Sequence, residues 1–182
     1  MSGFSNCGHG SCSALVHSPL SFTRGIVVYS SMRWRHHKDR ELLKRGANIN
    51  ATDGDGNAAL MVAEACTTRP GRPELVELLI ANGAAVNLQA RNGRTALMYA
   101  AKNGDTQAVK ALLKSGASVN IADNEGQTAL MEAVRFSCDK DTIRALIDAG
   151  ADLKATDHQG QSALSSTCLK SGLGGIISPN TR

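Results

Sequence analysis

Short apolar segments recur along the chain in a fixed order, separated by polar breaks. Each unit has a small apolar stretch similar to Ala-Leu-Met, a polar break, and a second apolar stretch that ends in Leu-Leu or Leu-Ile shortly before a Gly. In the most regular unit, Val109, Leu112 and Leu113 follow the 3.6-residue period of a helix. The pattern therefore predicts pairs of short helices, with an irregular connection after each pair.

The helix pairs are repeats, because two sequence strings recur in the same phase. A Gly followed by a string similar to Thr-Ala-Leu-Met occurs at 56–61, 93–98, 126–131 and 160–165. A string similar to Gly-Ala-x-Val-Asn occurs at 46–50, 83–87, 116–120 and 150–154. The leading glycines of the second string are 37, 33 and 34 residues apart, and a period in this range is typical of stacked supersecondary units.

Signals for the ends of the helices agree with this interpretation. A Thr or Ser before Ala-Leu suits a helix N-cap, because its hydroxyl accepts from the free N–H groups of the first turn. Gly116 suits the end of a second helix, since Gly adopts the left-handed conformation without a Cβ penalty. Asp123 and Gly126 are placed for a tight turn, so the connection from Asn120 to Thr128 is expected to project as a finger. Helices of roughly eight to ten residues are too short to be stable alone, so stacking must stabilise them.

These strings resemble the ankyrin repeat, whose pattern is Gly-x-Thr-Pro-Leu-His-x-Ala-Ala, a second helix ending in Leu-Leu, and Gly-Ala-x-Val-Asn. Residues 90–120 match it almost throughout, and four in-phase copies extend the resemblance over about 39–168. It implies an all-α ankyrin-repeat solenoid of stacked helix-turn-helix units with projecting β-turn or hairpin fingers. The Pro of the pattern is Ala in every copy, and its His is Met61, Met98, Met131 and Ser165. These departures are expected to affect stability more than fold.

The repeat phase predicts a domain at 38–170, between a leader at 1–37 and a disordered tail at 171–182. Within it we expect a half repeat (38–52), three repeats (53–89, 90–122 and 123–156) and a partial repeat (157–170). The first full repeat carries an insertion with Pro70 and Pro73 between its helices. The incomplete fourth copy leaves open that the chain is a truncated or alternative product of a longer array. The leader is interpreted as disordered, as a mitochondrial-type transit peptide, or as a degenerate first half repeat.

Charge and cysteine content narrow the possible partners and compartments. The net charge of +4 arises before Asp39, because the rest of the chain has 16 basic and 16 acidic residues. Nucleic-acid binding usually needs a clustered basic face. The surplus of basic over acidic residues lies before Asp39, so attachment to a nucleic acid or to an anionic membrane through the leader is a further alternative. Five cysteines at no common repeat position do not indicate a disulfide framework, which favours the cytoplasm or the nucleus. No apolar run is long enough to span a membrane.

The sequence contains no motif that would supply catalytic chemistry. It lacks a Gly-x-Ser-x-Gly nucleophile motif, a phosphate-binding Gly-rich loop and a His-Glu-x-x-His metal motif. We therefore expect a monomeric, non-catalytic protein–protein interaction module or adaptor, without cofactor, metal or small-molecule substrate. The alternative is a regulatory or targeting segment of a larger enzyme or channel.

The resemblance implies that a partner binds to the fingertips and to the exposed side of the first helices. Carried over by position, the fingertip residues are Asp55, Asn57, Arg91, Asn92, Arg94, Asn124, Glu125, Gln127 and His158. The groove residues are Val62, Tyr99, Lys102, Glu132, Arg135 and Phe136. Tyr99, Phe136 and Arg94 are expected to be the main anchors, by residue type. For Phe136, an aromatic side chain packed beneath its own loop is the alternative.

Overall fold

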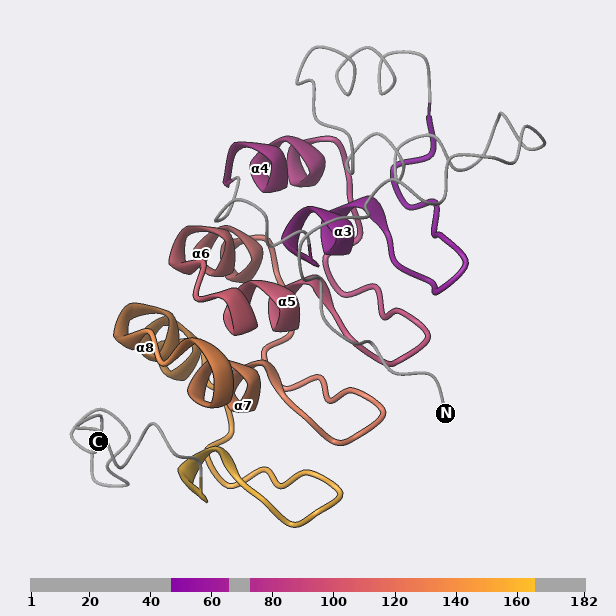
Figure 1. Cartoon of the computed structure of the whole chain (residues 1–182). Helices are drawn as coiled ribbons and strands as arrows, with labels where there is room; N and C mark the ends of the chain where they lie inside the picture. The colour runs from indigo at the N-terminus through magenta and orange to yellow at the C-terminus, as the bar shows by residue number, and fades with distance from the viewer. Residues whose placement is uncertain (1–46, 66–72, 166–182) are drawn as a thin grey trace, which may run out of the picture.

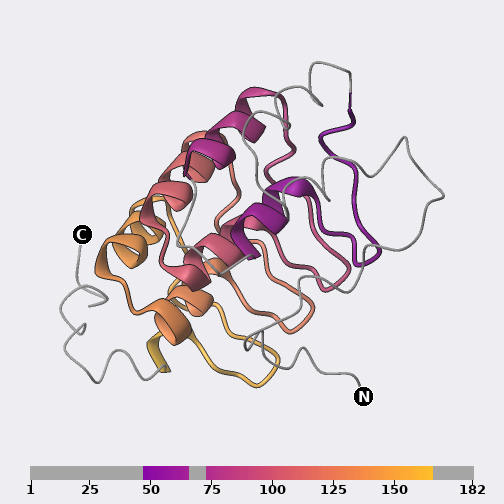
Figure 2. The ribbon, with the colours of Figure 1, turned by 45° about the horizontal axis from the view of Figure 1, so that its top comes forward.

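The structure, a computed structural model, describes residues 47–65 and 73–165, and six α-helices lie in two rows within these ranges (Figure 1). The inner row consists of α3 (Ala59–Ala65), α5 (Ala96–Asn103) and α7 (Ala129–Glu132). The outer row consists of α4 (Pro73–Ala81), α6 (Thr106–Lys114) and α8 (Lys140–Asp148). Fingers precede the inner helices and project together along one side of the molecule (Figure 2). The predicted all-α repeat solenoid is confirmed. The leader, the insertion between α3 and α4, and the tail lie outside the described residues.

Two further helical segments complete the described part. A π-helix, η1 (Ala133–Ser137), continues α7, and a 3-10 helix, η2 (Ala163–Ser165), follows the last finger. The backbone N–H of Cys138 donates to the carbonyl of Ala133 at 2.9 Å, which closes the wide turn of η1. This turn takes up the one extra residue of the third repeat.

Side-chain caps start the helices of the two regular repeats. The Thr95 hydroxyl accepts from the N–H of Met98, and the Thr128 hydroxyl accepts from the N–H of Met131, both at 3.4 Å. The outer helices α6 and α8 are capped by carboxylates, Asp105 and Asp139, which accept from backbone N–H groups at 3.0 and 2.8 Å. The predicted Thr caps are confirmed, and the Asp caps add a second start signal in each repeat.

The core is a thin layer between the two rows. Fully buried alanines on the inner row allow the neighbouring helices to approach closely, and they are Ala100, Ala101 and Ala133. Leu79, Leu112 and Leu146 are buried on the outer row. The methionines that replace the His of the ankyrin pattern, Met61, Met98 and Met131, are also buried and fill space beside them.

An asparagine ladder joins consecutive repeats. Asn87 accepts from the N–H of Ser118 at 2.7 Å and donates to the carbonyl of Gly116 at 3.0 Å. Asn50 and Asn120 make the same pair of bonds one repeat earlier and one repeat later. The last residue of each Val-Asn or Ile-Asn string therefore satisfies two backbone groups of the next repeat, which explains why it recurs.

The fingers are tight turns that stack backbone against backbone. The N–H of Asn124 donates to the carbonyl of Asn92 at 3.0 Å, and the N–H of His158 donates to that of Glu125 at 3.0 Å. Gly93 has φ +80°, and a Cβ there would lie 2.7 Å from the Asn124 nitrogen. Glycine is therefore required at this position both by the left-handed turn and by the close approach of the next finger.

Cys138 occupies an uncommon backbone position. It has φ 53° and is the one non-Gly residue with positive φ in the described part of the chain, whereas Gly104 holds the in-phase position before the outer helix of the second repeat, with φ 70°. Cys138 is also disulfide-bonded in the structure. The irregular spacing of the cysteines gave no indication of this bond, so cysteine content no longer argues for a reducing compartment.

Candidate functional site

The inner helices and the fingers form one face, and most of the expected partner-binding residues lie on it at or near the surface. The exposed ones are Asp55, Arg91, Asn92, Asn124, Glu125, Arg135, Phe136 and His158. Those of intermediate exposure are Asn57, Arg94, Tyr99 and Lys102. Gln127, Glu132 and Val62 are buried, contrary to expectation.

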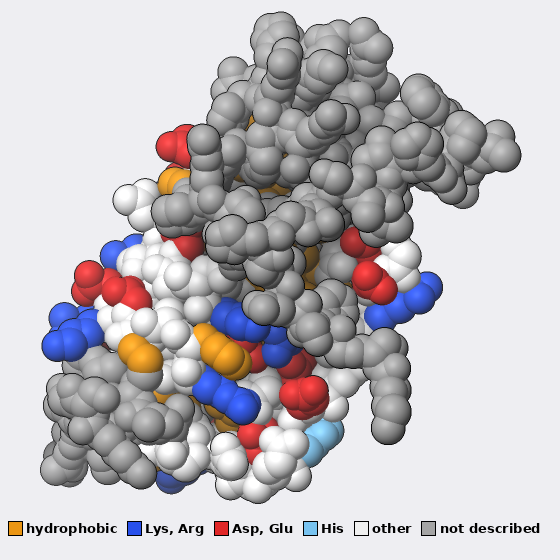
Figure 3. All heavy atoms as spheres, in the orientation of Figure 1, with side chains coloured by type: hydrophobic (Ala, Val, Ile, Leu, Met, Phe, Trp, Pro, Cys, Tyr) orange, Lys and Arg blue, Asp and Glu red, His pale blue; other side chains and the backbone are white. Residues whose placement is uncertain are grey.

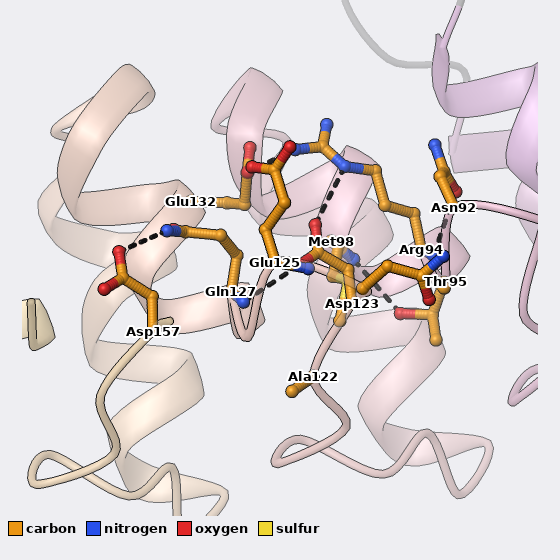
Figure 4. Close-up of polar contacts among 12 residues, drawn as sticks. Asn92, Arg94, Thr95, Met98, Ala122, Asp123, Glu125, Gln127, Glu132 and Asp157 are labelled. Atoms are coloured by element: carbon orange, nitrogen blue, oxygen red, sulfur yellow. Dashed lines mark hydrogen bonds and ion pairs between the residues drawn. The ribbon is translucent and has the colours of Figure 1, made fainter. Parts of the chain in front are cut away.

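Arg94 links the second repeat to the third through two carboxylates. Its Nε lies 3.2 Å from Oδ2 of Asp123, and its Nη2 lies 2.7 Å from Oε1 of Glu132 (Figure 4). The guanidinium also lies 5.9 Å from the ring centroid of Tyr99. Arg94 was expected to be a free fingertip side chain, but its donors are largely engaged within the protein, with 20% of the side chain exposed.

Glu132 is buried because Arg94 reaches over it from the preceding repeat. Only 1% of Glu132 is exposed. This burial raises the pKa of its carboxyl group, and the positive charges of Arg94, Lys102 and Arg135 lower it in part. The expectation that Glu132 offers its side chain directly to a partner is wrong. Its role is to hold Arg94 in place.

Gln127 is buried by the equivalent contact one repeat later. Its Nε2 donates to Oδ2 of Asp157 at 2.6 Å (Figure 4). Asn57, at the same repeat position, instead donates to its own Asp53, because Ala90 stands where the next finger would need an Asp. The expectation of a surface-exposed Gln127 is therefore wrong.

Asp123 and Asp157 also belong to this face, although Asp123 was expected only in a turn and Asp157 was not expected to be part of the site. Each binds the side chain that precedes the inner helix of the repeat before it, 29 or 30 residues earlier in the chain. The sequence does contain a pattern that indicates this pairing, because Arg94 and Gln127 are each followed 29 or 30 residues later by an Asp. The pairing becomes visible only when the fingers are known to stack.

Replacing Asp123 with Ala is expected to lower the free energy of unfolding by about 2 kcal/mol. Its Oδ1 accepts from the backbone N–H groups of Glu125 and Gln127, both at 2.9 Å, and its Oδ2 binds Arg94. Asp123→Asn keeps an oxygen for the turn but removes the charge, so about half of that loss is expected. Urea denaturation followed by circular dichroism measures both.

Asp53 provides the matched control. Its Oδ1 accepts from the N–H groups of Asp55 and Asn57 in the same type of turn, and in the described part of the chain its side chain binds no arginine. Asp53→Asn should therefore change stability less than Asp123→Asn does. Equal losses in the two variants would mean that the ion pair with Arg94 contributes nothing measurable.

A group of aromatic and basic side chains lies on the same face beside Arg94. Phe136 is 50% exposed, so the alternative that it packs beneath its own loop is wrong. Lys102 Nζ lies 4.5 Å and Arg135 Cζ lies 5.5 Å from the centroid of its ring. In the space-filling view, basic side chains adjoin exposed hydrophobic ones over α5 and α7 (Figure 3).

The described residues lack two further features, a metal-binding cluster and a membrane-spanning helix. They contain no cluster of three or more His, Cys, Asp or Glu side chains that could hold a metal ion. None of the helices in these ranges has the length and apolar character needed to cross a bilayer. Beside Arg135 there is a shallow hollow, lined in part by Gln127 and Met131.

A family model described as ankyrin repeats, in three copies, matches residues 64–157, which is more than half of the chain. The match covers the helices from α4 to α8 and the two fingers that precede α5 and α7. Ankyrin repeats are generally protein–protein interaction modules and are typically non-catalytic. By this match and by its stacked helix pairs, the chain belongs to the ankyrin-repeat family.

Proposed function

We propose that the protein is a non-catalytic adaptor that binds a protein partner on the face formed by α5, α7, η1 and the adjoining fingers. The observation that carries this proposal is a group of four side chains on the inner side of two stacked repeats, in which Arg135 and Phe136 are exposed and Tyr99 and Lys102 are partly exposed. Aromatic residues and arginine are the types that contribute most at protein interfaces. Because their backbone is fixed by the stack, little conformational entropy is lost on binding.

The fingertips are proposed to form the edge of this surface. Arg91, Asn92, Asn124, Glu125 and His158 are exposed there, and backbone hydrogen bonds join the fingers that carry them. Gln127 and Glu132 are not included, because both are buried. Such an arrangement has an aromatic centre and a polar rim, as protein interfaces commonly do.

Site-specific photo-cross-linking tests the location of the surface. A photoreactive phenylalanine analogue at position 99 or 136 is expected to capture a protein from lysate that the same analogue at position 114 does not capture. Lys114 is the control because it is exposed on the outer helix α6. Capture of one common set of proteins from all three positions would contradict the proposed location.

Tyr99→Ala is expected to weaken binding of the captured partner, once it is purified, by about 1 kcal/mol or more. Tyr99 packs against the core from a partly exposed position and is not one of the fully buried core residues, so the helical content should be kept and the unfolding midpoint should change less than for a buried residue. Isothermal titration calorimetry measures the affinity. Unchanged affinity would remove Tyr99 from the interface.

A further inference from the structure

Phe136 is unusually exposed for a large apolar side chain in this fold. Among the described residues only Phe136, at 50%, and Leu164, at 39%, are exposed large hydrophobic side chains. Val134, two residues earlier in η1, is fully buried. The π-turn therefore directs one side chain into the core and leaves the aromatic ring at the surface.

Two cations lie against this ring. Lys102 comes from the end of α5 in the second repeat, and Arg135 comes from η1 in the third. Their charged groups lie 4.5 and 5.5 Å from the ring centroid, within the range of a cation–π interaction. The ring thus holds two positive charges beside an exposed apolar surface, a group called here the cation–aromatic patch (Lys102, Arg135 and Phe136).

Two acidic groups of this face are engaged within the protein. Asp123 and Glu132 are buried and bind Arg94. Neither Lys102 nor Arg135 has a carboxylate within ion-pair distance among the described residues. Glu125 is an exposed acid of this face, but it belongs to the finger and not to the helices. Both cations act on the pKa of Glu132, but Glu132 is buried and paired with Arg94, so among the described residues no carboxylate forms an ion pair with either cation.

We propose that the cation–aromatic patch binds an acidic segment of a protein partner, with a large apolar side chain of that segment on the Phe136 ring and its carboxylates on Lys102 and Arg135. This inference rests on the proposed function and specifies the chemistry of the partner. Glu125 repels carboxylates at the fingertip, so the acidic residues of the segment lie over α5 and η1. An apolar side chain flanked by carboxylates can pack on the Phe136 ring and at the same time form ion pairs with Lys102 and Arg135.

A nucleic acid fits the patch less well than a peptide. Tight binding to a phosphate backbone needs several basic side chains along its path, whereas this patch has two, and Glu125 lies on the adjoining finger. The chain from Asp39 onward also has equal numbers of basic and acidic residues. These observations favour a short acidic peptide segment over a long polyanion.

Selection from a display library of random peptides on the purified full-length chain tests the inference. Peptides in which Asp or Glu flanks a Leu, Phe or Trp are expected to be enriched. A synthesised representative should bind the Lys102→Glu/Arg135→Glu double variant at least about tenfold more weakly, and its affinity should fall as salt is raised. Arg144→Glu on the outer helix α8, where Arg144 is exposed, is the matched charge-reversal control and should leave the affinity close to wild type.

The outcomes separate this inference from the proposed function. Enriched peptides without acidic residues, whose binding nevertheless needs Tyr99 or Phe136, would overturn the inference and leave the binding face standing. Peptides that bind independently of both aromatic residues, or no enrichment at all, would count against both. A single-stranded oligonucleotide or phosphatidylserine vesicles that bind with the same dependence on Lys102 and Arg135 would show that the patch recognises polyanions and not an acidic peptide.

Discussion

Replacing Glu64 with Gln is expected to stabilise the protein at neutral pH by about 3 kcal/mol. Glu64 lies near the end of α3 and is 2% exposed, and neither of its carboxylate oxygens has a hydrogen-bond partner among the residues that the structure describes. Burial, and secondarily the negative charge of Asp105, raises the pKa of Glu64 from 4.5 to about 8. The in-phase residue of the second repeat is Ala101, which is fully buried, so the site is built for a small apolar group.

The pH dependence of this effect has a defined sign. Between about pH 4.5 and pH 8 the carboxyl group is ionised in the unfolded chain but keeps its proton in the folded protein. The unfolded state then binds fewer protons, so the free energy of unfolding falls as pH rises through this window and levels off above it. In Glu64→Gln this decline should be much shallower.

Urea denaturation at several pH values between about 5 and 8 measures this difference. Glu77→Gln is the control, because Glu77 is exposed on α4, and its stability curve should parallel that of the wild type. Glu64→Ala provides a second variant without a buried amide. If wild type and both Glu64 variants show parallel curves, the carboxyl group of Glu64 does not hold a proton in the folded state.

Replacing Leu112 with Ala is expected to lower the free energy of unfolding by about 2 to 5 kcal/mol. Leu112 is fully buried on α6, which packs between α4 and α8. The Leu112→Ala substitution therefore leaves a cavity at two repeat interfaces. Both α4 and α8 lose contacts with the leucine side chain, and no other side chain replaces them. Because each short helix depends on its neighbours, the loss should appear in the main unfolding transition measured by circular dichroism.

Leu113→Ala is the matched control, since it removes the same atoms one position further along α6. Leu113 is only partly buried and packs against the edge of the core. The Leu113→Ala variant should therefore lose less than half of the free energy of unfolding that Leu112→Ala loses. Equal losses would show that the stack does not distinguish these two faces of α6, contrary to the described packing.

The sequence was sufficient to predict the helix pairs and their phase. The Thr caps, the glycines of the fingers and the apolar period of α6 all depend on residues close to one another in the chain. These features are local, and the structure confirms them. The Asn at the end of each Val-Asn or Ile-Asn string was also recognised as part of the repeat. Its hydrogen bonds to the next repeat could not be predicted, because they join residues about 30 positions apart.

The environment of the binding face was harder to predict, because it depends on side chains one repeat apart. Glu132 occupies the same helical position as Tyr99, yet Glu132 is buried because Arg94 covers it. Gln127 is buried for the same reason, through Asp157. The exposure of Phe136 depends on the π-turn, which no local propensity indicates. Helical phase thus predicted the positions of these residues but not their solvent exposure.

The corner between the inner and the outer helix is where repeat length varies in this chain. The π-turn absorbs the surplus residue of the third repeat there, and the longer insertion of the first repeat falls at the same corner of the sequence. Residues added at this position change the side chains displayed outside without shifting the leucines that hold the rows together. New specificities can therefore arise by insertion at the corner, while the hydrophobic framework is inherited unchanged.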